Sequence, residues 1–387
     1  MIHIVDAPHA DLVLVSPYPP DRGRLSEHSQ QLAEGLKARG LITEVLADVE
    51  LSGQGSASNV KVTRAWKPGN PLSLLGIPFR ILRSRPRLVL FNSHFAVFGR
   101  SKPTNFIGFL SIFLVCKLGW LFGYKTVVVL HSIPEAVDTQ LYGLKPSFLN
   151  RLGLLLAEKF ALSCDAVVVT MRMYQRVIEH RFGLPSYYIP HGAWVYPPPR
   201  DRPGKPRDSL LFLGYLHPGK DMEMLASAFR ELKTRHPDLK LKLATVPHPN
   251  FPDSKSRLNV FKGMEGVEFL GFLTDDELSS VFGSSVALVL PYVSATGTSG
   301  VLHVVSAAGL PVVATDLIEF RQSQAEGAGL ILAEDAGDIA HAVDRLIEDE
   351  SYWNEVSMRS RRFGAGRSWD NVCSEFVSLF RMLWTSA

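Results

Sequence analysis

Small and hydroxyl-bearing residues fill one loop of the sequence, TGTSG at residues 296–300. Apolar, β-branched runs at residues 286–290 and 311–315 flank this loop and the Ala-rich segment after it, which predicts a strand, a loop, a helix and a second strand. The first N–H groups of a helix lack intrahelical partners and carry partial positive charge, so such a loop can bind a phosphate. An ordinary crossover with small turn residues is the alternative.

A second loop of this kind follows the apolar run at residues 210–213. Gly214, His217 and Lys220 lie in the segment GYLHPGK before a predicted helix, and a lysine in such a glycine turn is suited to bind an anion. The spacing GxxxxGK also occurs in the phosphate-binding loop of ATPases, which needs Ser or Thr next to bind magnesium. This sequence has Asp221 instead, which would repel a phosphate. The pattern therefore indicates an anion site and disfavours an ATPase.

Two further candidates lie where predicted strands of the first half end. The run at residues 126–130 ends in His131, so an imidazole is expected at the carboxyl edge of the sheet, either facing a ligand or capping the next turn. A strand at residues 12–15 leads into a loop that contains Gly23 and Arg24. No GxGxxG with a suitably spaced acid, no isolated DxD triplet and no His/Cys/carboxylate cluster occurs. The sequence therefore favours neither a nicotinamide cofactor nor a metal ion.

Strand-like runs alternate with amphipathic helical stretches through both halves of the chain, which predicts parallel sheets with helices on both faces. Five prolines and a glycine in residues 196–207, YPPPRDRPGKPR, interrupt this alternation and mark a linker. We therefore predict an α/β protein with two Rossmann-like doubly wound domains that face a cleft. The expected parts are an N-terminal domain (1–195), the linker (196–207), a C-terminal domain (208–362) and a last helical segment (363–387).

The charge is unevenly distributed, although the net charge is only +3. No Asp or Glu occurs between Glu50 and Glu135, a span with eleven Lys or Arg. Such a span produces a positive field, and an apolar segment accompanies it, so an anionic membrane surface is the expected partner. No nucleic-acid-binding motif is present, and nucleic acid is therefore not expected. A merely solvated basic face is the alternative.

The apolar segment, residues 106–122, has Lys117 as its only charge and nearly reaches the length of a membrane span. Two glycines, a serine and this lysine interrupt it, so a buried crossover helix is the better prediction. The N-terminus lacks the basic start and long apolar core of a signal peptide, and three widely spaced cysteines favour a reducing compartment. We expect a cytoplasmic protein, peripherally bound to the inner face of the cell membrane.

Taken in order, these segments resemble the GT-B fold glycosyltransferases of the glycogen-synthase-like group, often called group 1, which use nucleotide sugars and retain anomeric configuration. In the first half the similar segments are SPYPPDRGRLSEHSQQLAEGLKARG, VVVLHS, ALSCDAVVVTM and YYIPHGAW. In the second half they are LFLGYLHPGKDMEMLASAFREL, VEFLGFLTDDEL and VALVLPYVSATGTSGVLHVVSAAGLPVVATD. RSWDNVCSEFVSLFRML resembles the terminal helix, which in the family crosses back to the first domain. The resemblance extends nearly from end to end.

The resemblance implies roles for individual residues. Lys220 would neutralise the donor diphosphate, and His217 would be a weaker, pH-dependent substitute for the arginine that some members have at this position. His131 would contact the transferred sugar and stabilise the charge that develops at the breaking bond. The other residues implied in donor binding are Gly23 in the opening loop, Phe272 at the base, Thr298 in the phosphate loop, and the backbone amides of Ser299, Gly300 and Val301 at the distal phosphate.

The sequence also departs from the family. Two family glutamates, eight positions apart, are replaced by Thr296 and Val304, and Arg24 replaces the second glycine of the opening pair. A valine cannot accept hydrogen bonds from a ribose, so either a neighbour such as His303 does so or nucleotide binding is weak. The retained lysine, histidine and phosphate loop favour a working retaining hexosyltransferase. A catalytically silent GT-B scaffold, or a partner subunit of a glycosyltransferase complex, is the alternative.

The implied reaction is displacement of a nucleoside diphosphate from the anomeric carbon with retention. The departing phosphate oxygen can itself take the acceptor proton, so no protein base, cofactor or metal is expected. The donor would be a UDP-, GDP- or other nucleotide sugar. A lipid-linked or polysaccharide acceptor, in surface polysaccharide or glycolipid assembly, fits the basic and apolar first half.

Overall fold

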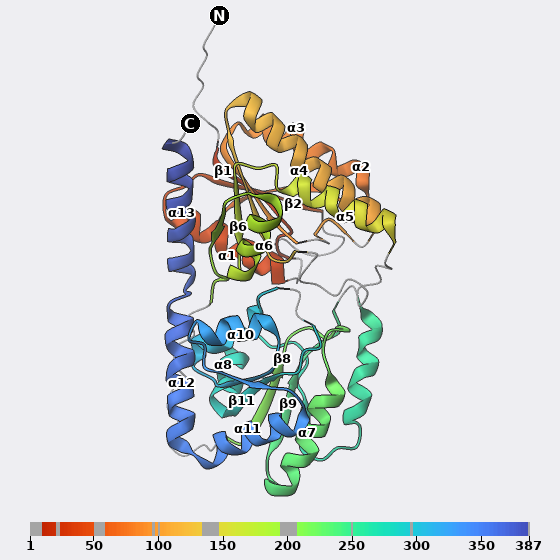
Figure 1. Ribbon diagram of the computed structural model, residues 1–387, viewed down its shortest axis with the longest axis vertical. Coiled ribbons are helices and arrows are strands. Elements are labelled where there is room, and N and C mark those ends of the chain that lie inside the picture. The colour runs from red at the N-terminus through yellow and green to blue at the C-terminus, as the bar shows by residue number, and fades with distance from the viewer. Residues whose placement is uncertain are drawn as a thin grey trace, which may run out of the picture. The chain divides into compact units, whose positions relative to one another are not determined.

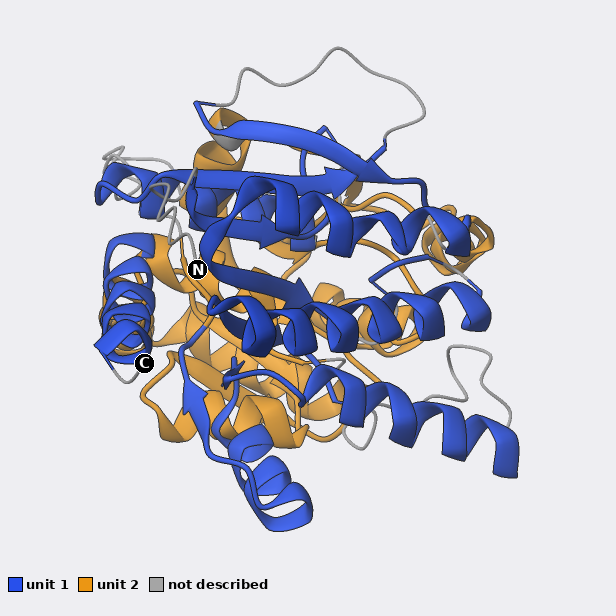
Figure 2. Ribbon diagram, turned by 90° about the horizontal axis from the view of Figure 1, so that it is seen from above, with its two compact units in different colours: residues 1–190, 369–387 blue, residues 191–368 orange. Residues whose placement is uncertain are grey.

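The computed structural model describes residues 10–20, 24–49, 59–94, 97–99, 101–133, 147–193, 207–248, 251–294 and 297–385. The chain divides into two compact units: unit 1 is Met1–Pro190 with Trp369–Ala387, and unit 2 is His191–Ser368 (Figures 1 and 2). Each unit contains one parallel sheet covered by helices. The predicted fold class, two Rossmann-like doubly wound α/β domains, is confirmed. Of the expected linker at residues 196–207, all but Arg207 lies outside the described residues.

Unit 1 contains a seven-stranded sheet in the order β3-β2-β1-β4-β5-β6-β7. All of its neighbouring strands are parallel, and β1 pairs with both β2 and β4. The strand order reverses between β1 and β4, and parallel sheets bind ligands at the carboxyl ends of the strands beside such a switch point. The strands are β1 (Ala10–Val15), β2 (Thr43–Asp48), β3 (Lys61–Trp66), β4 (Pro86–Ser93), β5 (Lys125–Leu130), β6 (Ala166–Val169) and β7 (Ser186–Tyr188).

Two separate cores lie on the two faces of this sheet. Figure 1 shows α13 on one side of the sheet and α3, α4 and α5 on the other. One face is covered by α1 (Arg24–Ala38) and α13 (Trp369–Thr385). The other is covered by α2 (Pro71–Leu74), α3 (Gly76–Ser84), α4 (Lys102–Phe122), α5 (Phe148–Ala161) and α6 (Arg172–Phe182).

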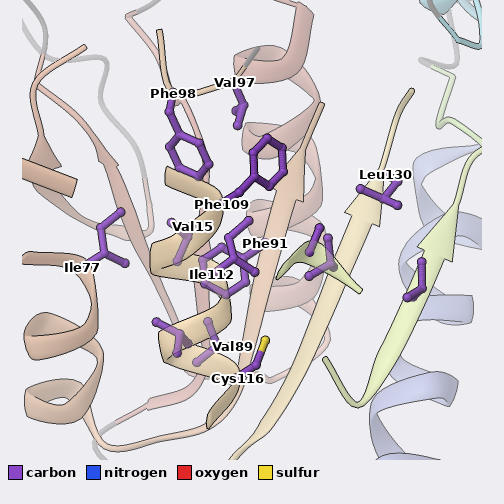
Figure 3. Close-up of a cluster of buried hydrophobic side chains, with 14 of the residues drawn as sticks. Val15, Ile77, Val89, Phe91, Val97, Phe98, Phe109, Ile112, Cys116 and Leu130 are labelled. Carbon is purple, nitrogen blue, oxygen red and sulfur yellow. The ribbon is translucent and has the colours of Figure 1, made fainter. Parts of the chain in front are cut away.

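Helix α4 is a crossover between β4 and β5, as the sequence predicts, but it is only partly buried. Its inner face packs Ile112 and Cys116 into the core with β4 (Figure 3). Gly108 lies directly against the ring of Phe98, where a side chain would lie within 2.0 Å of a ring carbon, so this interruption of the apolar run is a packing requirement. By length and composition α4 could cross a membrane, with 39% of its most apolar window buried in unit 1. The outer face of this helix is exposed and apolar, contrary to the expectation of a buried helix.

Unit 2 contains a six-stranded parallel sheet in the order β10-β9-β8-β11-β12-β13, with its switch point between β8 and β11. Its strands are β8 (Ser209–Leu213), β9 (Lys240–Ala244), β10 (Val267–Phe269), β11 (Ser285–Leu290), β12 (Val312–Thr315) and β13 (Leu330–Ala333). Its helices are α7 (Met222–Arg235), η2 (Pro252–Phe261, a 3-10 helix), α8 (Asp275–Ser284), α9 (Gly300–Ala308), α10 (Ile318–Ala325), α11 (Ala336–Glu348) and α12 (Glu350–Ala365).

Helix α8 begins with a capping box. The Thr274 backbone N–H and hydroxyl both donate to Glu277 Oε2 at 2.8 Å. At the C-terminal end of unit 2, α12 extends to Ala365, and the chain assigned to unit 1 resumes at Trp369.

Candidate active site

The two predicted phosphate loops lie side by side in unit 2, because β8 and β11 are neighbouring strands at the switch point. Gly214, directly after β8, has φ +122°, and a side chain there would lie 3.3 Å from Val301 Cγ2. Gly219 accepts a hydrogen bond at its carbonyl from Val293 N at 3.0 Å, and Asp221 N donates to Pro291 O at 2.7 Å. The residues predicted at positions 214–220 and 298–301 are therefore brought together.

Lys220 is the central cation of this pair of loops. It is only 5% exposed, and its Nζ lies 2.7 Å from the centre of the Tyr292 ring, a close cation–π contact. The Tyr292 backbone is fixed by Thr315, whose Oγ1 accepts from Tyr292 N at 3.0 Å and donates to Tyr292 O at 2.7 Å. The Tyr292 hydroxyl lies 3.5 Å from Ser299 Oγ, so one aromatic ring connects the lysine to the second loop.

The side chain of His217 is uncharged in this structure. Burial, followed by the nearby charges of Lys220, His248 and Arg257, lowers its pKa to about 3. Its Nδ1 accepts a hydrogen bond from Gly219 N at 3.1 Å, which places the ring proton on Nε2. His217 therefore shapes the glycine turn and offers a neutral donor where some family members have an arginine cation.

The N-terminus of α9 has the features of an anion site, a side-chain cap and backbone N–H groups without intrahelical partners. Ser299 is its N-cap and accepts from Leu302 N at 3.3 Å, so the N–H groups of the first turn point toward the loop. Thr298 is partly exposed just before the cap. Gly300 faces the His191 ring, whose Nε2 would lie 3.4 Å from a side chain at that position.

Neither of the two residues considered as ribose contacts, Val304 and His303, has a side chain accessible to a ligand. Val304 and His303 are each only 3% exposed. His303 Nδ1 is within 2.9 Å of the Ser299 carbonyl, and its ring packs on His191 and Phe363. Burial lowers the pKa of His303 well below its usual range, so this ring is neutral.

Phe272 lies beyond the edge strand β10 and is 53% exposed. It follows Gly271, which has φ +70°. The resemblance places this aromatic side chain at the base, and that role stays a prediction.

His131 lies at the carboxyl end of β5 in unit 1, and its Nε2 is 2.6 Å from Asn92 Oδ1 at the end of β4. The His131 ring meets the His28 ring edge to face, with 4.5 Å between centroids. The histidine is therefore held by neighbouring side chains at the switch point of its own sheet. Gly23, Thr296 and the side chain of Arg24 lie outside the described residues.

Four residues of these sites are absent from the sequence-based prediction: His28, Asn92, Arg257 and Tyr292. Arg257 lies on the 3-10 helix η2 and donates to the Lys220 carbonyl at 3.1 Å, which adds a second cation beside the first loop. Tyr292 is the second residue after β11, and Asn92 is the last but one residue of β4, so their positions at strand ends are the signal that could have revealed them. Within the described residues, no group of three or more His, Cys, Asp or Glu could hold a metal ion.

The fold and the paired loops define the class of this protein, a doubly wound α/β protein with two glycine-containing loops at the switch point of its second sheet. Residues 207–349 match the family of group 1 glycosyl transferases. The chain is 30% identical over 186 residues to a phosphatidyl-myo-inositol mannosyltransferase of Mycolicibacterium smegmatis. The aligned region covers 46% of each protein. The chain thus matches about half the length of this relative.

Solved structures show the same two-domain fold. Sucrose-phosphate synthase from Thermosynechococcus elongatus superposes with a TM-score of 0.77 at 16% identity, over 97% of this chain and 99% of that one. Anabaena HepE, in a complex with UDP and glucose, gives a TM-score of 0.69 at 15% identity over 96% and 100%. The predicted GT-B fold is confirmed, and the predicted family of group 1 glycosyl transferases is confirmed for residues 207–349. Retention and the roles of individual residues stay predictions.

Proposed function

We propose that this protein transfers a sugar, with retention, from a nucleoside-diphosphate sugar to an acceptor, and that unit 2 binds the donor. The observation that carries the proposal is the meeting of the loops after β8 and β11, which places Lys220 and the capped N-terminus of α9 next to each other. HepE, which shares the fold, was solved with UDP and glucose.

In this proposal the donor diphosphate is neutralised by Lys220, Arg257 and the first N–H groups of α9. His217 adds a neutral Nε2–H donor, because its pKa of about 3 keeps it uncharged in the protein without donor. A bound diphosphate would raise that pKa by bringing negative charge close to the ring. Phe272 stacks on the base. Neither Val304 nor His303 contacts the ribose, because both are buried.

The reaction breaks the bond between the anomeric carbon and the diphosphate oxygen and forms a bond from that carbon to an acceptor oxygen. The acceptor proton passes to the departing phosphate oxygen, so atoms and charge balance without a protein base. His131 contacts the transferred sugar and stabilises positive charge at the anomeric carbon. The protein groups act mainly by electrostatic stabilisation of the leaving diphosphate, and no cofactor or metal takes part in the proposed step.

Titration calorimetry with UDP and with GDP tests the donor site. Lys220→Met removes the charge and keeps most of the side-chain volume, so the Tyr292 ring stays covered. We expect it to weaken binding of the preferred nucleotide by about 1.5–3 kcal/mol, or roughly tenfold to a hundredfold in Kd. Lys262→Met, at an exposed lysine of the same unit, is the matched control and should bind as wild type does. Equal affinity of the two variants would place the diphosphate elsewhere.

We further propose a lipid-linked or polysaccharide acceptor and peripheral attachment of unit 1 to the inner face of the cell membrane. One relative is a mannosyltransferase of phosphatidyl-myo-inositol, which is a lipid. In this chain, the outer sides of α4 and α5 carry exposed apolar side chains, Trp120 at 87% and Phe148 at 78% being the most exposed. We name this surface the membrane face; its exposed apolar residues are Leu114, Trp120, Leu121, Phe122, Phe148, Leu149 and Leu152.

The charge of the membrane face suits an anionic bilayer. Helices α4 and α5 contain four basic residues, all exposed, and a single carboxyl group. That group, Glu158, has its pKa raised by burial to about 7, so it is largely neutral in mildly acidic surroundings. The basic residues are Lys102, Lys117, Arg151 and Lys159. Exposed aromatic side chains beside basic ones are typical of surfaces that lie at the lipid headgroups.

A further inference from the structure

A chain of buried polar side chains lies at the switch point of unit 1, which we name the switch-point cluster. It joins the carboxyl ends of β1, β4 and β5 to the second turn of α1. Apart from the partly exposed His131, its members are at most 2% exposed. The cluster consists of Ser16, His28, Ser29, Asn92 and His131.

Asn92 is the centre of this cluster, because its carboxamide contacts three of the other side chains. Its Oδ1 lies 2.6 Å from His131 Nε2. Its Nδ2 donates to Ser29 Oγ at 2.7 Å and lies 3.2 Å from His28 Nδ1. Ser29 Oγ is in turn 2.6 Å from Ser16 Oγ. Buried polar groups this close are strongly coupled, so the amide and the two imidazoles must adopt compatible hydrogen-bond roles.

If both imidazoles are neutral, two arrangements of the hydrogens satisfy the amide contacts. With the carboxamide oriented as in this structure, Oδ1 accepts, so His131 must carry its proton on Nε2, and His28 must accept at Nδ1. With the amide turned over, both assignments reverse: His131 Nε2 accepts and His28 Nδ1 donates. The orientation of Asn92 therefore decides which nitrogen of His131 is the acceptor.

We infer that Asn92 is a positioning residue, which holds His131 as the neutral Nε2–H tautomer with Nδ1 as the acceptor nitrogen of the ring. This inference rests on the proposed function, in which His131 contacts the transferred sugar. A sugar hydroxyl that meets His131 at Nδ1 must then donate its hydrogen to the ring. If the ring becomes charged during transfer, the Asn92 carbonyl oxygen already faces the Nε2–H group and stabilises the imidazolium.

The other members of the cluster keep Asn92 in this orientation. The His28 ring lies edge-on to Trp369 at 4.9 Å, so the first residue of α13 also packs on the cluster. Ser29 Oγ is also within 2.8 Å of the Leu25 carbonyl, which ties the cluster to the start of α1. The positioning device thus includes two helices as well as three strand ends.

Nuclear magnetic resonance of histidine-selectively ¹⁵N-labelled protein tests the inference without any activity assay. His131 signals are assigned by their loss in His131→Gln. In the wild type we expect the Nε2–H tautomer at His131, and in Asn92→Leu a mixture of tautomers. Asn92→Asp places a carboxylate beside the ring and should raise the pKa of His131 by about one to three units relative to wild type. Ser111→Ala, a buried serine that hydrogen-bonds Leu74 O and Ile107 O on the other face of the sheet, is the control and should change neither signal.

An Nδ1–H tautomer at His131 in the wild type would overturn the inference, as would a tautomer that does not respond to Asn92→Leu. If Asn92→Leu fails to fold, the pKa change in Asn92→Asp decides the question alone. Once a donor is known, Asn92→Leu should lower kcat with little change in the KM for the donor, and Asn92→Asp should shift the pH profile. Failure of the proposed function would give a different result. The wild type would then transfer no sugar, while the tautomer of His131 would still depend on Asn92.

Discussion

At the scale of single residues, the positive charge of the proposed donor site comes from Lys220 and Arg257 and not from His217, which stands where some family members have an arginine. Burial beside these two cations makes a charged His217 unfavourable, and the ring instead accepts the Gly219 N–H. An uncharged residue at this position is therefore compatible with diphosphate binding, because η2 supplies a cation from another part of unit 2.

The neutral state of His217 predicts a pH dependence of stability. Its pKa of about 3 in the fold lies below the usual histidine value of 6.5, so between these values the unfolded chain binds more protons, and stability falls as the pH falls. His217→Asn retains an acceptor near the position of Nδ1 but does not titrate. Between pH 7.5 and pH 5 wild type should lose at most about 2 kcal/mol relative to this variant, seen as a decrease of several degrees in the difference between their melting temperatures. A difference in melting temperature that does not change across this pH range would show that the fold does not lower the pKa of His217.

Sequence motifs revealed some of the site residues, and only the tertiary contacts of the structure revealed the others. Lys220 and Ser299 follow strands that their β-branched composition makes recognisable, so their meeting could be predicted from parallel topology alone. Arg257 could not be found in this way, since the 3-10 helix that carries it has no apolar periodicity and reaches the loop only through the fold. The sequence did not reveal the role of Asn92, because an amide within an apolar strand does not indicate its hydrogen-bond partners.

At the scale of elements, the donor site depends on how closely the turn after β8 approaches α9. Gly214 adopts φ +122°, which residues with side chains rarely do, and a Cβ there would press on Val301. The sequence indicated a glycine turn, but the contact with α9 follows from the neighbouring positions of β8 and β11 in the sheet.

Gly214→Ala should therefore disturb the loop as well as lower stability. We expect a loss of about 1–3 kcal/mol in stability from backbone strain and at least a tenfold weaker affinity for the preferred nucleotide. The matched control is Gly263→Ala, at a glycine with φ +73° that has open space around its Cβ position. It should be destabilised by strain and bind nucleotide as wild type does. Thermal melting and calorimetry on both variants measure the two effects, and a similar loss of affinity in both would exclude a specific role for the turn.

The amphipathic character of α4 was only partly evident from the sequence. Its apolar run predicts burial, but the sheet offers core contacts to one face only, which leaves Trp120, Leu121 and Phe122 exposed near its end. Composition cannot distinguish a helix that is apolar because it is buried from one whose outer face contacts a second apolar phase.

The membrane face should bind anionic lipid. We expect the protein to co-sediment with vesicles containing phosphatidylglycerol but not with phosphatidylcholine alone, and high salt should release it, because each basic residue contributes about 1 kcal/mol that ions screen. Replacing Trp120 and Leu121 with serine should weaken binding severalfold. Ile42→Ser, at an exposed apolar residue of unit 1 outside this face, should not. Equal binding to neutral vesicles, or binding to neither, contradicts the proposal.

At the scale of the whole molecule, the sequence overstated the positive field of the first half. Eleven basic residues lie between Glu50 and Glu135, and within the part of the chain that the structure describes at least four of them form ion pairs with distant acids: Lys61 with Glu44, Arg64 with Asp48, Arg87 with Asp11 and Lys125 with Asp165. A count along the sequence cannot anticipate these pairs, because parallel strands bring distant acids beside the basic residues. The overall architecture was predictable, since alternating strands and helices admit few topologies.

The central claim is that this chain transfers sugar with the help of His131, and a transfer assay with radiolabelled nucleotide sugars and membrane extract tests it most directly. Wild type should transfer label from at least one UDP- or GDP-sugar, with little effect of EDTA. His131→Ala should reduce turnover by about 10²–10³ while remaining folded and retaining its nucleotide affinity, because it removes one electrostatic stabiliser from unit 1. A wild-type protein that neither transfers nor hydrolyses any nucleotide sugar would contradict the account and identify the chain as a catalytically silent scaffold.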